Sequence, residues 1–298
     1  MQATSITAPT DETASAQEQA AAQLRSKLHG LWAEVADSWA EYAEHVDERS
    51  ARLTEAMLER VALAPGDRVL ELACGAGGAG LAAAERVAPN GEVVLSDVAA
   101  EMTEAAAARA RARGLTNVST RVLDLEQIDE PDASYDVVLC REGLMLVPDP
   151  ASAAREIQRV LRPGGRVALA VWGERERNPW LSVMFDAISA QLGCPVPPTG
   201  IPGPFSLQDA DRLAALLVEA GLSNVDVSEA SVPLRAGSFG EWWTARCALA
   251  GPLTKILAAL PDDATQAIRA GARDATAPYA TADGLEFPGV ALIASATR

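Results

Sequence analysis

The chain is poor in the residues that most often bind metals. Only two histidines, His29 and His45, occur among its 298 residues. The four cysteines lie far apart and include no C-x-x-C pair: Cys74, Cys140, Cys194 and Cys247. Because zinc sites are built from closely spaced Cys and His, we expect no metal site. The spacing of the cysteines also gives no reason to expect a disulfide.

Long apolar runs and an excess of positive charge are also missing. No stretch of 18 apolar residues occurs, so we expect no transmembrane helix and no membrane partner. With 41 acidic and 25 basic residues, the formal net charge is −16. Binding to a phosphate backbone needs clustered Lys and Arg, so we expect no nucleic-acid partner. Residues 1–19 lack the basic and apolar regions of a signal peptide, which makes the cytoplasm the expected compartment.

Apolar periodicity predicts alternating strands and helices through most of the chain. Strands are expected at 68–73, 92–96, 117–123, 135–140, 166–172, 225–234 and 289–297. Helices are expected at 77–87, 99–113, 150–161, 180–192 and 207–220. Repeated strand–helix units of this length imply an α/β fold, in which helices cover both faces of a parallel sheet.

Segments outside this alternation are expected to cap the sheet. Residues 1–15 are rich in Thr, Ala and Ser and are expected to be disordered. Residues 16–62 are expected to form a helical lid, with one helix over 16–46 and a second over 49–61. Insertions after residue 172, including the helical stretch 240–280, would complete a cap over the carboxyl edge of the sheet. Ligands of open α/β sheets bind at that edge.

The most informative segment is the run from Val69 to Gly80, where an apolar strand meets a glycine-rich turn. Gly75, Gly77 and Gly80 have the G-x-G-x-x-G spacing, which lets the backbone turn sharply and approach a ligand closely. Asp97 ends the next strand, where a carboxylate can accept hydrogen bonds from the hydroxyls of a ribose. The sequence therefore predicts a nucleoside-binding crevice.

Two classes of cofactor fit this crevice. In an NAD-dependent oxidoreductase, Asp97 would bind the adenosine ribose. Glu71, in the strand before the turn, disfavours that interpretation because its carboxylate would repel a diphosphate. S-adenosylmethionine carries an ammonium group, a sulfonium and a ribose, and no phosphate. A methyltransferase is therefore favoured, with an oxidoreductase or a non-catalytic S-adenosylmethionine-binding protein as alternatives.

Further motifs follow in order: Asp124-Leu125 after the third strand, the run from Tyr135 to Asp149, and Leu-Arg-Pro-Gly-Gly at 161–165. With these, residues 68–172 resemble a class I S-adenosylmethionine-dependent methyltransferase of the ubiquinone/menaquinone-biosynthesis-like (methyltransferase type 11) group. The N-terminal pattern from Trp32 to Tyr42 resembles helices that precede the core in this group. Overall, the resemblance covers roughly residues 30 to 235.

This resemblance implies a Rossmann-like, doubly wound, seven-stranded, mostly parallel sheet. Residues 63–172 would form the S-adenosylmethionine-binding core, and residues 173–298 the remainder of the sheet with helical cap insertions. The cofactor would be S-adenosylmethionine, converted to S-adenosylhomocysteine. The residues implied to bind it are Glu71, Ala73, Gly75, Gly77, Asp97, Val98, Met102, Asp124, Leu125 and Arg141. Glu71 and Ala73 depart from the group, in which Asp and Gly are commonest at these positions.

The acceptor side is predicted from chemistry rather than from motifs. A general base is needed only if the acceptor must lose a proton, and histidine suits that role near neutrality. His45 and Tyr42 are three residues apart on one helical face, so they are the candidate catalytic residues. The alternative is that this face packs on the core and leaves His45 at the rim.

Tryptophans concentrate in or beside the expected cap, which favours a flat, aromatic or polycyclic acceptor from natural-product metabolism. The candidate acceptor-binding residues are Trp39, Glu142, Trp172 and Trp180. The alternative is that the indoles simply fill the core of the added helices. The sequence leaves open the acceptor's identity, whether C, N or O is methylated, and the oligomeric state, a homodimer included.

Overall fold

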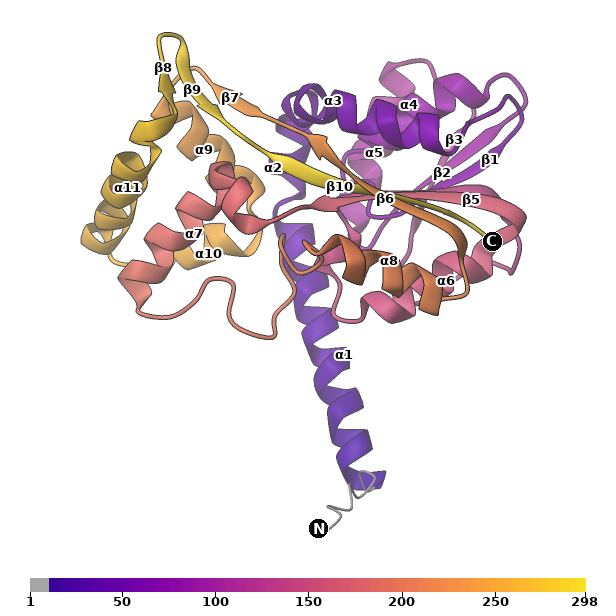
Figure 1. Ribbon diagram of the computed structural model, residues 1–298, viewed down its shortest axis with the longest axis horizontal. Coiled ribbons are helices and arrows are strands. Elements are labelled where there is room, and N and C mark those ends of the chain that lie inside the picture. The colour runs from indigo at the N-terminus through magenta and orange to yellow at the C-terminus, as the bar shows by residue number, and fades with distance from the viewer. Residues whose placement is uncertain (1–10) are drawn as a thin grey trace.

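The computed structural model describes residues 11–298, and a seven-stranded sheet crosses its centre (Figure 1). The strands are β1 (Arg68–Glu71), β2 (Glu92–Asp97), β3 (Val118–Val122), β4 (Tyr135–Arg141), β5 (Leu161–Trp172), β6 (Ser223–Ser231) and β10 (Val290–Thr297). They lie in the order β3-β2-β1-β4-β5-β10-β6. Neighbours among β1 to β5 are parallel, whereas β10 is antiparallel to both β5 and β6. The predicted Rossmann-like, doubly wound, mostly parallel sheet is confirmed.

Helices cover both faces of this sheet. They are α3 (Ala43–Arg60), α4 (Gly78–Val87), α5 (Ala100–Ala112), α6 (Pro150–Val160) and α8 (Ala210–Glu219). Helices α3 and α4 pack together over one face, α6 and α8 pack together over the other, and α5 packs on β2 and β3 (Figure 1). Because both faces are covered, the central strands are apolar and buried almost continuously, as Val69 and Leu70 of β1 show.

The N-terminal region differs from its prediction in two ways. It forms α1 (Asp11–Glu34), α2 (Ala36–Glu41) and α3, so the helix expected over 16–46 is broken at Val35 and at Tyr42. Residues 11–15, expected to be disordered, are part of helix α1. Residues 1–10 lie outside the described part of the chain.

The second half of the expected lid belongs to the core. Helix α3 packs on β5 and β10, with Leu53 and Met57 fully buried. Helix α1 instead projects from the sheet (Figure 1). The region 16–62 therefore combines a projecting helix with a structural one.

The C-terminal half supplies most of the cap. Its helices are α7 (Pro179–Leu192), α9 (Phe239–Leu249), α10 (Pro252–Ala258) and α11 (Asp262–Thr276). A small antiparallel sheet, absent from the prediction, joins β7 (Leu234–Ala236), β9 (Gly284–Phe287) and β8 (Ala280–Thr281). Short 3-10 turns lie at Leu144–Leu146, Arg175–Arg177 and Ala277–Tyr279. The strand expected over 225–234 is split, because Pro233 has no N–H to continue a ladder.

Most predicted ends of the core elements lie within one or two residues of the observed ones. Strand β5 differs most, because it begins at Leu161, which pairs with Tyr135 ahead of an irregularity in register. Helix α8 and strand β6 each differ from the prediction by three residues at one end. No helix in residues 11–298 is both long and apolar enough to cross a bilayer.

Truncating a buried side chain of α3 tests whether α3 belongs to the core while α1 does not. Leu53→Ala should lower the free energy of unfolding by about 2–5 kcal/mol, because it leaves a cavity against the sheet. The matched change Leu31→Ala on α1, where the side chain is half-exposed, should cost under about 1 kcal/mol. Urea denaturation of both variants measures the difference. Equal losses would contradict the assignment of α3 to the core.

Candidate active site

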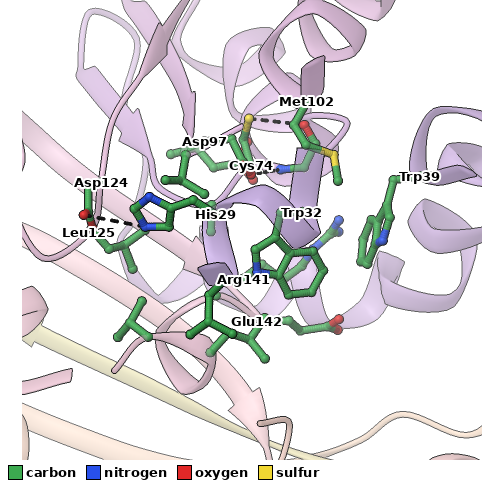
Figure 2. A pocket seen from close by; sticks show the side chains of 18 of the residues that line it. His29, Trp32, Trp39, Cys74, Asp97, Met102, Asp124, Leu125, Arg141 and Glu142 are labelled. Atoms are coloured by element: carbon green, nitrogen blue, oxygen red, sulfur yellow. Dashed lines mark hydrogen bonds and ion pairs between the residues drawn. The ribbon is translucent and has the colours of Figure 1, made fainter. Parts of the chain in front are cut away.

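Two adjoining cavities open at the carboxyl ends of the central strands. The first is lined by the glycine-rich turn, the tip of β2 and the loops after β3 and β4 (Figure 2). We call it the glycine-turn cavity. The second lies under α1, α7, α9 and α10 and is called the cap cavity. Six residues line both: Leu28, Trp32, Trp39, Val46, Glu142 and Leu146.

Asp97 holds the glycine-rich turn against the tip of β2. Its Oδ2 accepts a hydrogen bond from the Gly75 N–H at 2.9 Å, and its Oδ1 accepts one from the Ala99 N–H at 3.1 Å. Burial raises the pKa of Asp97, although these backbone hydrogen bonds act in the opposite direction. The carboxylate lines the glycine-turn cavity and is 7% exposed. It therefore fixes the turn as well as facing the cavity.

The glycines of the turn have different roles. Gly75 lines the glycine-turn cavity at a φ of +51°, and a Cβ there would lie 3.5 Å from the Trp39 ring. Gly77 is not among the lining residues. At its φ of +87°, a Cβ would lie 3.0 Å from the Cβ of Ala106 and 3.1 Å from Leu95 Cδ1. Gly77 thus serves close packing at the start of α4, and the structure does not place it where a ligand would touch it.

Glu71 lies at the buried end of the glycine-turn cavity. Its side chain accepts a hydrogen bond from the Gly80 N–H at 2.8 Å, and the residue is 1% exposed. Burial raises the pKa of Glu71 to about 7, even though nearby Arg141 and the Gly80 N–H lower it. Ala73, the next lining residue along the chain, has a φ of +50°, an unusual conformation for a residue with a Cβ.

Val98, Met102, Asp124 and Leu125 also line the cavity, as expected. Helix α1 contributes His29 to the lining, and its Nε2 lies 3.7 Å from Asp124 Oδ2 (Figure 2). Burial lowers the pKa of His29, while Asp124 acts to raise it. The sequence analysis did not assign His29 to this place, because the contact depends on how α1 docks.

Arg141 is held by α3. Its Nη1 donates to Thr54 Oγ1 at 2.7 Å, and its Nη2 lies 3.7 Å from Asp47 Oδ1. Asp47 also pairs with Arg109, which donates a second hydrogen bond to the Ala76 carbonyl in the turn at 2.7 Å. This network clamps α3, α5 and the glycine-rich turn together. Asp47 was not predicted, since nothing local in the sequence marks it.

Glu142 stands where the two cavities meet. Its Oε2 accepts a hydrogen bond from Arg49 at 2.8 Å, and its buried Oε1 has no partner among the described residues. The residue has a φ of +62°, a costly conformation for glutamate that is typical of functional sites. Trp39 stands at the same junction (Figure 2). Trp172 and Trp180 line the cap cavity, so all four predicted acceptor residues border it.

His45 and Tyr42, the predicted catalytic residues, line neither cavity. Their prediction assumed one continuous helix, whereas the chain is interrupted at Tyr42, between Trp39 and His45. His45 instead borders a third pocket with Arg52 and Arg235. Burial lowers the pKa of His45, helped by Arg246 and Arg49.

Comparison with known proteins agrees with this geometry. Residues 63–186 match a family model described as a methyltransferase domain. They belong to the class I S-adenosylmethionine-dependent methyltransferases.

The chain is similar to nocamycin O-methyltransferase of Saccharothrix syringae, with 42% identity over 113 residues, which are 38% of this chain and 40% of that one. It is also similar to the ubiquinone/menaquinone biosynthesis C-methyltransferase UbiE of Ectopseudomonas mendocina. Identity there is 36% over 133 residues, 44% of this chain and 52% of the relative. The chain thus spans about half, or less, of the length of these relatives.

Among solved structures, the YcgJ protein of Bacillus subtilis is similar in fold. The TM-score is 0.55 at 21% identity, covering 82% of this chain and 97% of that one. The likeness therefore extends beyond the methyltransferase domain to most of the chain, although identity at this level concerns the fold alone.

The raised pKa of Glu71 gives the methyltransferase domain a testable pH response. The proton on Glu71 stabilises the folded state below the ordinary carboxyl pKa of about 4.5, and this contribution is lost as pH rises through about 7. Glu71→Gln, which is neutral throughout, should therefore gain stability relative to the original protein between pH 5 and pH 8. Melting temperatures of both proteins across this range measure the gain. A constant difference would contradict the pKa assignment.

Proposed function

We propose that this protein transfers a methyl group from S-adenosylmethionine to a small, largely apolar metabolite that binds in the cap cavity. The observation that carries the proposal is the pairing of the two cavities. An acidic, turn-lined cavity of the kind that binds nucleosides opens directly into an apolar one, through shared residues that include Glu142.

The charges around the glycine-turn cavity support a cationic cofactor. Its lining carries five carboxylates, from Glu71, Asp97, Asp124, Glu126 and Glu142, and a single arginine, Arg141. S-adenosylmethionine brings an ammonium and a sulfonium, which such a lining favours. A dinucleotide would bring a diphosphate among these carboxylates, so the lining disfavours an NAD-dependent oxidoreductase. The residues present therefore fit the cofactor of the family.

Each part of that cofactor has residues suited to bind it. Asp97 can accept hydrogen bonds from the ribose hydroxyls, and Glu71 provides negative charge for the ammonium group. Val98, Met102 and Leu125 form the apolar surroundings expected for adenine. These roles follow the family resemblance and the position of each residue in the cavity.

The cofactor, when bound, supplies an electrophilic methyl group on its sulfonium. The chain's residues then have to align the acceptor and exclude water, as Trp32, Trp39 and Leu146 can do at the junction. Glu142 is the group placed to take up a proton from an acceptor hydroxyl or amine, through its unpartnered Oε1. Arg49 orients that carboxylate.

The acceptor class is supported by the walls of the cap cavity and by the relatives. Trp172, Trp180 and the proline-rich segment 196–204 give a flat, apolar surface suited to an aromatic or polycyclic metabolite. One relative is named for nocamycin, which supports an acceptor of the natural-product kind. Since one relative is an O-methyltransferase and another a C-methyltransferase, similarity does not select the atom methylated.

Cofactor binding tests the first half of the proposal. Calorimetry should show S-adenosylhomocysteine binding and no binding of NAD. Asp97→Ala should weaken the S-adenosylhomocysteine complex by about 1.5–3 kcal/mol, through the loss of charge-assisted hydrogen bonds. Asp129→Ala, at an exposed acid outside the cavity, serves as the control and should bind as the original protein does. Preference for NAD, or an unchanged affinity in Asp97→Ala, would refute the assignment.

Methyl transfer tests the second half. With S-adenosylmethionine labelled in its methyl group and a panel of aromatic alcohols and amines, Glu142→Gln should lose about 10²-fold or more in turnover, the usual contribution of a general base. Affinity for S-adenosylhomocysteine should change little. His45→Ala, outside both cavities, should retain turnover. Full activity in Glu142→Gln would remove this glutamate from the reaction, and cofactor binding without any transfer would favour a non-catalytic binding protein.

A further inference from the structure

The cap cavity contains a buried cation that forms no ion pair with any described residue. Arg246, in the last turn of α9, lines this cavity and is 3% exposed. Among the described residues, no carboxylate lies within salt-bridge distance of its guanidinium, and its buried Nε has no hydrogen-bond partner. The C-terminal end of a helix dipole compensates a positive charge only in part.

The groups around Arg246 add to this uncompensated positive charge. Arg49 also lines the cap cavity, and the one nearby carboxylate, Glu142, is already bonded to it. Two guanidinium groups thus share a single carboxylate, which leaves one excess positive charge. Burial lowers the pKa of Arg246 to about 9, and Arg49 contributes to the shift. At neutral pH the side chain is therefore still charged, and its burial is costly.

Both arginines are held in place by aromatic rings. The Cζ atoms of Arg246 and Arg49 lie 5.1 and 5.5 Å from the centre of the Trp180 ring, within the range of cation–π attraction. Trp180 is itself fixed, since its Nε1 donates to Asn178 Oδ1 at 3.0 Å and its carbonyl accepts from Trp242 Nε1 at 3.0 Å. The charge is therefore presented from a rigid wall, as in a preorganised binding site.

We infer that the acceptor carries an anionic group, such as a carboxylate, which pairs with Arg246 while its apolar body lies against Trp172 and Trp180. This inference rests on the proposed function and narrows it from an apolar acceptor to an aromatic acid. Arg246 lines the cap cavity but not the glycine-turn cavity, whereas Glu142 lines both. The anionic group is therefore an anchor, distinct from the atom that is methylated.

Matched pairs of ligands test the anchor directly. Benzoate, 2-naphthoate and anthracene-2-carboxylate are each compared with the corresponding neutral amide by calorimetry, with and without S-adenosylhomocysteine. At least one acid should bind the original protein about tenfold or more tightly than its amide, the effect of one charge-assisted hydrogen bond. Arg246→Met should bind acid and amide equally. Arg246→Lys, which keeps the charge, should retain part of the preference.

The control is Arg52→Met, because Arg52 borders the third pocket and not the cap cavity. This variant should keep the full preference for the acid. Thermal melting gives a second readout, which does not need a ligand. Without ligand, Arg246→Met should melt no lower than the original protein, since it removes an uncompensated buried charge while filling the same space. A structural arginine would instead lose several degrees on substitution.

Several outcomes would overturn the inference. These are equal affinity for acid and amide in the original protein, failure of all three acids to bind, or an acid preference that persists in Arg246→Met. The proposed function is judged separately, by whether the original protein binds S-adenosylhomocysteine. If it does not, the methyltransferase assignment fails, whereas the acid–amide comparison without cofactor still decides the role of Arg246.

Discussion

The site depends on the hydrogen bond that the Gly75 N–H donates to Asp97. This bond ties the glycine-rich turn after β1 to the tip of β2, so two neighbouring strands share one rigid rim. Glu71 forms a similar bond: its side chain accepts a hydrogen bond from the Gly80 N–H in the first turn of α4. Both acids are buried, and burial raises the pKa of each. The two carboxyl groups that hold the rim together also line the glycine-turn cavity.

The charged side chains of the two cavities differ in sign, although the cavities share six lining residues. Carboxylates outnumber arginines around the glycine-turn cavity, whereas Arg49 and Arg246 exceed the single carboxylate of Glu142 around the cap cavity. A positively charged donor and a negatively charged acceptor would each be drawn to its own side. Their charges would also attract across the junction. Specificity in this arrangement comes from charge placement on an otherwise apolar surface, rather than from many hydrogen bonds.

The sequence predicts the parts of the site that are local and misses those that depend on packing. Asp97, Glu71 and Gly75 lie at the ends of strands or in the turn, so hydrophobic pattern and spacing were enough to place them. His29, Asp47 and Arg246 act across more than 60 residues of sequence or from separate helices, and no spacing rule connects them to the site. Gly77 matches the motif but supports packing. The break at Tyr42 was missed because residues 36–46 have helical periodicity throughout.

The break at Tyr42 separates the helix that carries Trp39 from the helix that packs on the sheet. Helix α2 brings Trp39 to the junction, and α3 then starts in a new direction that is fixed by Leu53 and Met57 on the sheet. Asp47 and Arg49 precede these core residues on the same helix, so their positions are set by core packing. The packing of α3 on the sheet therefore also fixes Asp47, which pairs with Arg109, and Arg49, which orients Glu142. His45 precedes Arg49 by one helical turn and borders the third pocket, which Arg49 also lines. The longer Arg49 side chain reaches the cap cavity as well, whereas His45 lines neither cavity.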